Sequence, residues 1–193
     1  MPAPTAIIVG VRHASPAILR AVPTIFTPKP RVMPGADMLL KKEDLMHQRK
    51  YLRLKHYDYR QPGYYFLTLC CLNKKHYFGR CTRNQSWLNQ RGIIARELLQ
   101  SLTAHFPKCL PDSFIIMPNH LHCILIISDG NQHPLSTIIG SYKAAVSREI
   151  GKMFAGAKLW QRGYWERVIR DERELNHVRE YMLNNPARWC LRE

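Results

Sequence analysis

The stretch Ser113–Ser128, SFIIMPNHLHCILIIS, contains two apolar runs that are separated by a short polar break. The runs Ser113–Met117 and His120–Ser128 have the length and the content of branched aliphatic residues that are typical of buried strands. Pro118 and Asn119 between them favour a turn. Because so short a connection joins only antiparallel neighbours, the stretch predicts an antiparallel pair of strands within a sheet.

The segments on both sides of this pair extend the pattern to an alternation of strands and helices. The expected elements are a strand at Tyr64–Leu72, a helix at Arg91–Phe106, the two strands above, a helix at Pro134–Ile150 stopped by Gly151, a strand at Trp165–Ile169 and a helix at Asp171–Asn184 that ends before Pro186. The order β-α-β-β-α-β is that of the ferredoxin-like fold. We therefore expect an α+β protein with an antiparallel sheet and one additional C-terminal helix.

The domain organisation follows from composition. The chain has 193 residues, of which 46% are hydrophobic, so one domain of ordinary size can form a core. Seven of the 13 prolines fall within the first 34 residues. Because proline interrupts helices and central strands, we expect residues 1–45 to be a disordered or basic extension that is dispensable for folding, and residues 46–193 to be the single domain. No apolar run approaches the roughly 20 residues of a membrane helix.

The charge balance indicates the class of partner. Lys and Arg number 29 against 14 Asp and Glu, a net charge of +15, and residues 41–193 retain 25 basic and 13 acidic residues. Such a surplus favours a polyanionic partner, with nucleic acid ahead of an anionic membrane, although a solvated basic surface without a partner is the alternative. The six cysteines form no C-x-x-C pair, which disfavours a zinc ribbon and is typical of reduced thiols in a cytoplasmic protein.

Two histidines begin the second strand of the quoted stretch. His120 and His122 are two residues apart, so both imidazoles point to one face of the strand, while Leu121 and Cys123 face the other way. Two neutral imidazoles side by side can bind a divalent metal ion. An H-x-H pair alone is a weak signal, and a purely structural pair is the alternative, but two polar rings on an interior strand require a purpose.

The terminal helix presents a second polar pair. Leu175, Val178 and Met182 form its buried stripe, and Tyr181 and Asn185, one turn apart, flank that stripe. A phenol and an amide would therefore project together from the edge of the contact between helix and sheet. An ordinary amphipathic tyrosine beside a C-terminal capping asparagine is the alternative.

Several motifs together resemble a family. The run Met117–His122, MPNHLH, resembles the HUH motif (His, bulky hydrophobic, His) of single-tyrosine transposases. Four further stretches resemble the REP-associated tyrosine transposases, which are IS200-like. They are PGYYFLT at 62–68, LWQR at 159–162, VIRDE at 168–172 and YMLNNP at 181–186. The resemblance extends from Tyr57 to Trp189 in the same order.

This resemblance implies a ferredoxin-like core and the cleavage of single-stranded DNA. It implies that His120 and His122 bind Mg²⁺ or Mn²⁺ and that Tyr181, on the C-terminal helix, attacks phosphorus and forms a 5′-phosphotyrosine link. Asn185 is the implied third ligand, at a position where many relatives carry the longer glutamine. The implied partner is hairpin-bearing single-stranded DNA, the implied location is the cytoplasm with the nucleoid and no membrane, and the implied state is a monomer or homodimer.

DNA contacts are expected from basic and aromatic residues, because arginines neutralise phosphates and aromatic rings stack on unpaired bases. The candidates are Arg162, Arg167 and Arg170 around the fourth strand, Trp160 and Tyr164 beside it, and Lys143 and Arg148 on the second helix, with the run Lys41–Lys55 as an additional arm. Packed tryptophans and solvated arginines are the alternative. Two other functions remain open, namely a domesticated protein that binds single-stranded DNA or RNA without cutting it, and a metal nuclease in which water attacks.

Overall fold

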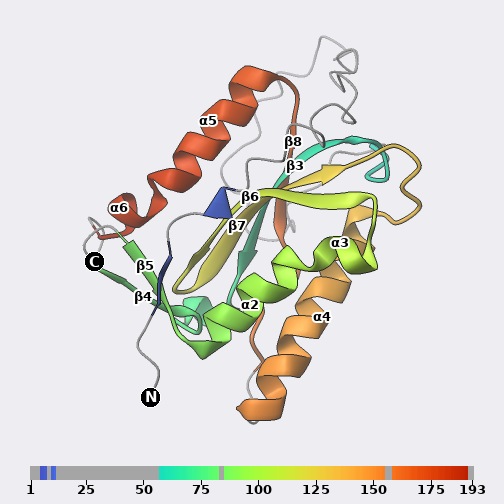
Figure 1. Cartoon of the computed structure of the whole chain (residues 1–193). Helices are drawn as coiled ribbons and strands as arrows, with labels where there is room; N and C mark the ends of the chain where they lie inside the picture. The colour runs from blue at the N-terminus through green and yellow to red at the C-terminus, as the bar shows by residue number, and fades with distance from the viewer. Residues whose placement is uncertain (1–4, 8–9, 12–56, 83–84, 155–157, 191–193) are drawn as a thin grey trace, which may run out of the picture.

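The computed structural model describes residues 5–7, 10–11, 57–82, 85–154 and 158–190. The run Lys41–Lys55 and the expected domain boundary after residue 45 lie outside these ranges. The centre of the molecule is a five-stranded antiparallel sheet of order β2-β6-β7-β3-β8 (Figure 1). Its strands are β2 (Gly10–Val11), β3 (Gly63–Cys70), β6 (Cys109–Met117), β7 (His120–Ile127) and β8 (Trp165–Ile169).

The expected fold class is confirmed. β6 and β7 form the predicted hairpin across Pro118 and Asn119, and β3 lies between β7 and β8. The crossovers from β3 to β6 and from β7 to β8 contain helices, so the four strands β3, β6, β7 and β8 have the ferredoxin-like order. The helices are α2 (Gln90–Gln100), α3 (Leu102–His105), α4 (Leu135–Met153), α5 (Glu172–Leu183) and α6 (Asn185–Cys190).

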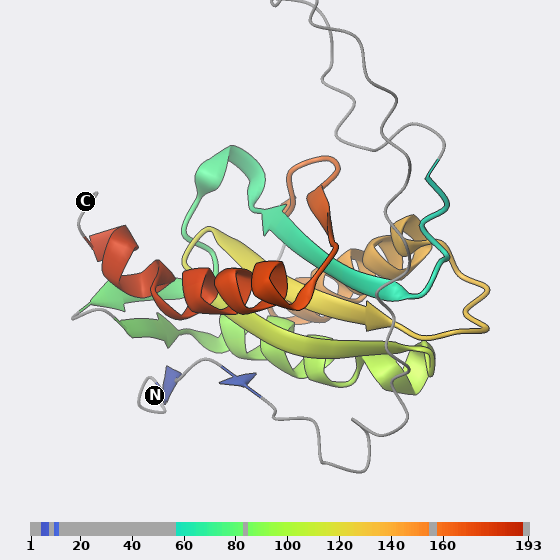
Figure 2. The same ribbon diagram turned by 90° about the horizontal axis from the view of Figure 1, so that it is seen from above.

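Helices cover both faces of the sheet (Figures 1 and 2). Tyr65, Leu67 and Leu69 of β3 belong to the larger core cluster, which also contains apolar residues of α2 and α4. Phe66 belongs to a second cluster, in which it packs with residues of α5 such as Val178. The central strands are apolar on both faces, which explains why β7 reads as a nearly continuous apolar run.

Helix α5 is fixed at its start and near its middle. The Asp171 side chain caps the helix by accepting a hydrogen bond of 2.7 Å from the Glu174 backbone N–H. Two turns on, the Arg179 guanidinium donates to both carboxylate oxygens of Asp112 in β6, at 2.6 and 3.0 Å. These contacts hold α5 across the sheet face that bears the two histidines.

Some elements were not expected. A second sheet of order β1-β5-β4 contains β1 (Thr5–Ile7), β4 (Gly79–Thr82) and β5 (Gln85–Leu88). The strands β1 and β2 lie within the proline-rich segment and pair only at sheet edges, where nearby prolines do not interrupt a ladder. Their side chains are not described, and whether residues 1–40 are dispensable stays a prediction.

One helix end also differs from expectation. Helix α4 continues through Gly151 to Met153, because one glycine costs a helix only about 1 kcal/mol. Helix α5 ends at Leu183, before Pro186 as expected. A further short helix, α6, was not expected; Pro186 lies in its first turn, where proline is tolerated. Within the described part of the chain, no helix has both the length and the hydrophobicity to cross a membrane.

Candidate active site

The two histidines lie at the start of β7, on the sheet face that α5 covers. His120 pairs with Cys70 of β3, and His122 pairs with Thr68. Their Nε2 atoms approach each other to 3.1 Å. Leu121 between them is fully buried in the opposite cluster, as the two-residue period of a strand predicts.

Hydrogen bonds determine which nitrogen of His120 carries the proton. The Asn119 amide nitrogen donates to the Lys74 carbonyl at 3.1 Å, which turns the amide oxygen toward His120. That oxygen lies 2.7 Å from His120 Nδ1 and can only accept. His120 Nδ1 is therefore the donor, and its Nε2 lone pair faces the neighbouring imidazole.

His122 is held from the other side. Its Nδ1 lies 2.9 Å from the Thr68 hydroxyl, and its ring stacks on Phe66 with 5.3 Å between centroids. Burial lowers the pKa of His120 to about 4. Burial and the neighbouring charge of His120 lower the pKa of His122 to about 3. Both rings are accordingly neutral near pH 7, which is the form that binds metal ions.

The donor set fits a divalent metal ion. Two ring nitrogens bound to one ion at about 2.1 Å and at a right angle are about 3.0 Å apart, close to the separation found here. The described residues contain no group of three or more His, Cys, Asp or Glu that could hold a metal ion, so the two imidazoles are the only such donors that the described part of the chain brings together here.

Tyr181 and Asn185 meet the histidines in one pocket. The pocket has a volume of about 570 Å³, and all four residues line it. The Tyr181 ring lies 5.5 Å from the His122 ring and 6.2 Å from Phe66, centroid to centroid. Asn185 is 7% exposed and begins α6. The fold therefore brings together the four residues that the sequence singled out, from segments about 60 residues apart.

Sequence reasoning missed other residues of this pocket. Lys74 and His76 come from the connection after β3, and Arg188 and Trp189 come from α6. The Trp189 ring lies 5.6 Å from the His120 ring. A continued helical pattern after Tyr181 would have found the last two, because positions i+7 and i+8 share a face with position i. Pro186 hid that pattern by suggesting the end of the helix.

The residues expected to bind DNA do not line this pocket. Lys143 donates to the carbonyls of Gln161 and Gly163, and Trp160 donates through its indole to the Lys143 carbonyl while packing against the core. Tyr164 also packs against the core. Arg162 is exposed, and Arg148 lies 3.6 Å from Glu149.

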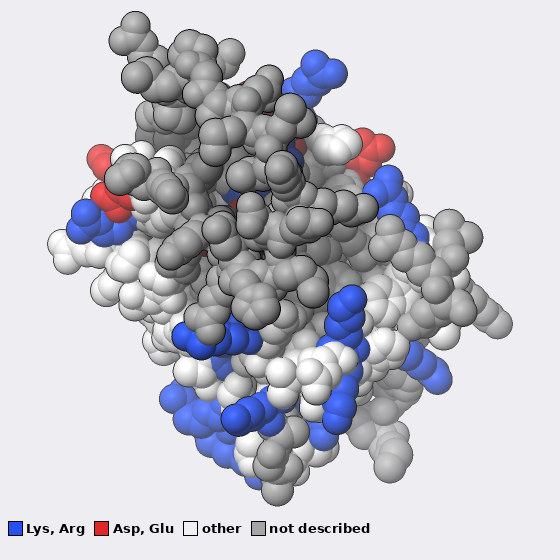
Figure 3. Space-filling model, turned by 180° about the vertical axis from the view of Figure 1, so that it is seen from behind, with Lys and Arg blue, Asp and Glu red and all other residues white. Residues whose placement is uncertain are grey.

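Arg167 and Arg170 form a separate surface. Both line a shallow depression at the start of α5, and Arg167 is paired with Glu174. Figure 3 shows that Lys and Arg side chains gather in the lower half of the face seen from behind, while Asp and Glu lie in the upper half. A role of these seven residues in DNA binding stays a prediction.

Residues 64–185 match the family model described as transposase IS200-like. An uncharacterized protein of Haemophilus influenzae is 35% identical over 164 residues, which cover 75% of this chain and 91% of that protein. The REP-associated tyrosine transposase of Escherichia coli K12 is 28% identical over 81 residues, 40% of this chain and 44% of that protein.

A solved structure has a similar fold. It is a REP-associated tyrosine transposase bound to a REP hairpin, with a TM-score of 0.56 and 19% sequence identity. The match covers 70% of this chain and 73% of the solved one. At this identity the likeness concerns the fold.

Proposed function

Because the chain belongs to the IS200-like transposase family, we propose that it cuts and rejoins single-stranded DNA through a covalent link to Tyr181. Hairpin-bearing DNA is the proposed substrate, since a relative of the same fold was solved with a REP hairpin.

One observation carries the proposal. A tyrosine ring from α5 and an imidazole from β7 lie 5.5 Å apart, centroid to centroid, in a pocket that also contains a second histidine and a buried amide. In a merely structural role, two neighbouring imidazoles would fill the core, whereas these line a pocket beside a phenol. A phosphate in that pocket would contact the Tyr181 phenol and the two imidazoles.

The proposed reaction is a transesterification. The Tyr181 oxygen attacks phosphorus, a bond between that oxygen and phosphorus forms, and the bond from phosphorus to the 3′ oxygen breaks. The phenol loses its proton, and the leaving 3′ oxygen gains one. The number of phosphoester bonds is unchanged, so the reverse attack by a 3′-hydroxyl rejoins DNA without another energy source.

His120, His122 and Asn185 would hold Mg²⁺ or Mn²⁺ at the reacting phosphate. A bound divalent ion supplies Lewis-acid polarisation of a phosphate oxygen. Asn119 and Thr68 would keep the imidazoles in position for that ion, as second partners of metal-binding histidines do.

The test is incubation with labelled hairpin-bearing single-stranded DNA and Mn²⁺, followed by denaturing electrophoresis. We expect a covalent protein–DNA band that EDTA, His120→Ala and His122→Ala each abolish, while DNA affinity is largely retained. Tyr181→Phe keeps the ring packing and should also abolish the band.

Tyr77→Phe is the matched control, because Tyr77 is half-buried against the other core cluster and does not line the pocket. This variant should leave the band unchanged. DNA binding without any covalent band in the parent chain would favour a non-cleaving protein. Cleavage without a band would favour attack by water.

A further inference from the structure

Part of the pocket has no role in the chemistry above. Besides the residues already assigned, five others line it: Cys70, Lys74, His76, Arg188 and Trp189. Lys74 and Arg188 are exposed and cationic, while Trp189 is half-buried. No Asp or Glu is among the described residues that line the pocket. Two cations without a carboxylate among these residues give the pocket a positive potential, which attracts an anion.

Lys74 is held in an unusual backbone conformation. Asn73 and Lys74 both have φ of 53°, a left-handed conformation that residues other than glycine seldom adopt twice in succession. Strain of this kind is maintained where the surrounding structure needs it. Here the Lys74 carbonyl accepts the Asn119 amide hydrogen bond that orients His120. The same turn thus supports the histidine pair and brings a lysine side chain to its pocket.

Arg188 and Trp189 reach the pocket from α6. The Arg188 guanidinium carbon lies 5.6 Å from the centre of the Tyr181 ring. The Trp189 indole is tilted by 35° against the His120 ring at 5.6 Å between centroids. A cation therefore lies beside the phenol and a large aromatic surface beside the histidine pair.

We propose that Lys74 and Arg188 bind two phosphates of the DNA backbone at the reacting position and that Trp189 stacks on an adjacent unpaired base. The proposal rests on the proposed function and adds to it the residues that hold the substrate. Aromatic stacking requires an unpaired base, so these residues select single-stranded DNA near the tyrosine.

The phosphate contacts are tested by salt dependence in the Tyr181→Phe background, where no chemistry interferes. The probe is fluorescein-labelled oligothymidylate, and its affinity is measured by anisotropy over a range of NaCl concentrations. Each phosphate contact contributes about 0.7 to the slope of log K against log salt for single strands. Lys74→Gln and Arg188→Gln should each reduce the slope by about that amount, and Lys74→Arg should restore it.

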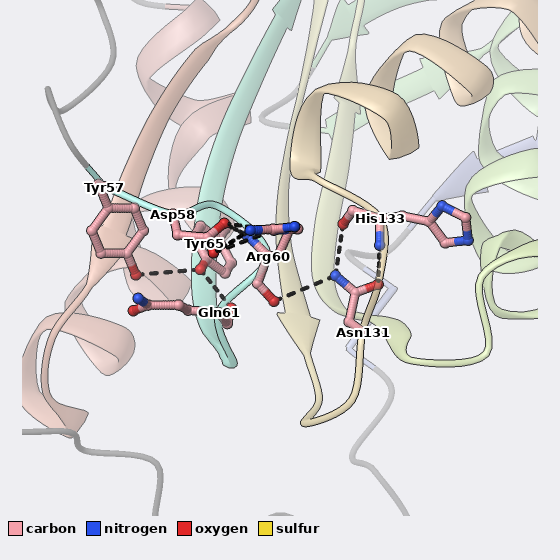
Figure 4. A network of polar contacts seen from close by, with 7 residues as sticks. All are labelled: Tyr57, Asp58, Arg60, Gln61, Tyr65, Asn131 and His133. Carbon is pink, nitrogen blue, oxygen red and sulfur yellow. Dashed lines mark hydrogen bonds and ion pairs between the residues drawn. The ribbon is translucent and has the colours of Figure 1, made fainter.

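Arg60→Gln is the matched control. Arg60 is exposed, and its guanidinium donates to both carboxylate oxygens of Asp58 before the start of β3, at the end of the strand opposite to Lys74 (Figure 4). This variant should leave the slope unchanged. Equal slopes for the parent, Lys74→Gln and Arg188→Gln, all with unchanged thermal melting, would overturn the phosphate assignment.

The base contact is tested by removing either the indole or the bases. The Tyr181→Phe chain should bind oligothymidylate about tenfold more tightly than an abasic oligomer of equal length. Trp189→Leu should lose most of this preference, and Trp189→Phe should retain part of it. An unchanged preference in Trp189→Leu would overturn the stacking assignment.

The two proposals fail separately. If the parent chain forms no covalent adduct but the Lys74, Arg188 and Trp189 variants bind as expected, the substrate contacts are supported and the strand transfer is not. If the parent forms the adduct while the three variants bind like the parent, the strand transfer is supported and these contacts are overturned.

Discussion

Asn119 is a residue whose importance only the structure reveals. In the sequence it is a turn residue after Pro118, whereas in the fold its amide links the Lys74 carbonyl to His120 Nδ1. Partners of this kind hold a histidine in the tautomer that binds metal. Its substitution should therefore affect metal affinity more than stability.

We predict that Asn119→Ala weakens Mn²⁺ binding by about 10- to 100-fold, measured by isothermal titration calorimetry. Asn131→Ala is the matched control, because the Asn131 amide donates to the His133 carbonyl in a loop outside the pocket (Figure 4). Equal Mn²⁺ affinities of the parent and Asn119→Ala would show that the hydrogen bond to His120 does not orient a ligand.

The burial of the two imidazoles predicts a pH dependence of stability. Their pKa values in the folded chain are about 4 and about 3, while a histidine in the unfolded chain has a pKa of about 6.5. Between pH 4 and about 6.5, the unfolded chain therefore binds more protons than the folded chain. The free energy of unfolding should accordingly fall as pH decreases from about 6.5 toward 4.

Urea denaturation in EDTA at several pH values measures this contribution. The double variant His120→Asn, His122→Asn should lose less stability between pH 6.5 and 4 than the parent, while the remaining histidines are common to both proteins. The same pH dependence in both proteins would contradict the burial of neutral imidazoles.

At the scale of whole elements, the attachment of α5 to the sheet depends on one ion pair, between Arg179 of α5 and Asp112 of β6. Asp112 lies next to a bulge in β6 and is almost buried, with a 7% exposed side chain, and its partner Arg179 is 36% exposed. Ser113 donates a further hydrogen bond to the same carboxylate. Removal of the arginine would leave a buried charge with one neutral donor.

We predict that Arg179→Met destabilises the chain by about 2–3 kcal/mol in urea denaturation, less than a fully buried pair because the arginine is partly exposed. The double variant Asp112→Asn, Arg179→Met should recover part of that loss. Arg173→Met, at an exposed position of the same helix, should change little. A loss in Arg173→Met as large as in Arg179→Met would contradict a specific anchor.

The position of α6 also leads to a chemical prediction. Cys190 at its end lies 3.6 Å, sulfur to sulfur, from Cys81 of β4, and a disulfide between them would shorten this distance to about 2.05 Å. A disulfide oxidant such as oxidised glutathione should join the two thiols, with two electrons and two protons passing to the oxidant.

The thiol titre checks this prediction. All six cysteines are free, and oxidation should lower the titre from six to four. Cys190→Ser should keep its five thiols under the same conditions. A disulfide mapped to other cysteines, or a parent that keeps six thiols, would contradict the docking of α6 on β4.

At the scale of the whole molecule, long apolar runs and helix caps made the core predictable. The run His120–Ser128 and the pattern Asp171-x-x-Glu174 correspond closely to β7 and to the start of α5. The strands β4 and β5 were not expected, because each is only four residues long, too short for its sequence pattern to indicate a strand. Lys74 was not expected in the pocket either, because it reaches the pocket through an unusual backbone turn that its residue type does not suggest.

The arrangement of the site was predictable only in part. Strand period placed His120 and His122 on one face, and helical spacing placed Tyr181 and Asn185 together. That these two pairs meet depends on α5 crossing the sheet, a tertiary contact that no local pattern encodes. Arg188 was not predicted as a pocket residue, because Pro186 favours the end of a helix and the sequence therefore indicated no helical face beyond it.

The central claim is that Tyr181 becomes linked to DNA, and peptide mapping of the trapped adduct tests it most directly. After digestion with nuclease and trypsin, we expect the nucleotide mass to remain on the peptide Glu180–Arg188, which contains no other tyrosine. A nucleotide on Gly163–Arg167, which contains Tyr164, or the same adduct yield from Tyr181→Phe, would contradict it.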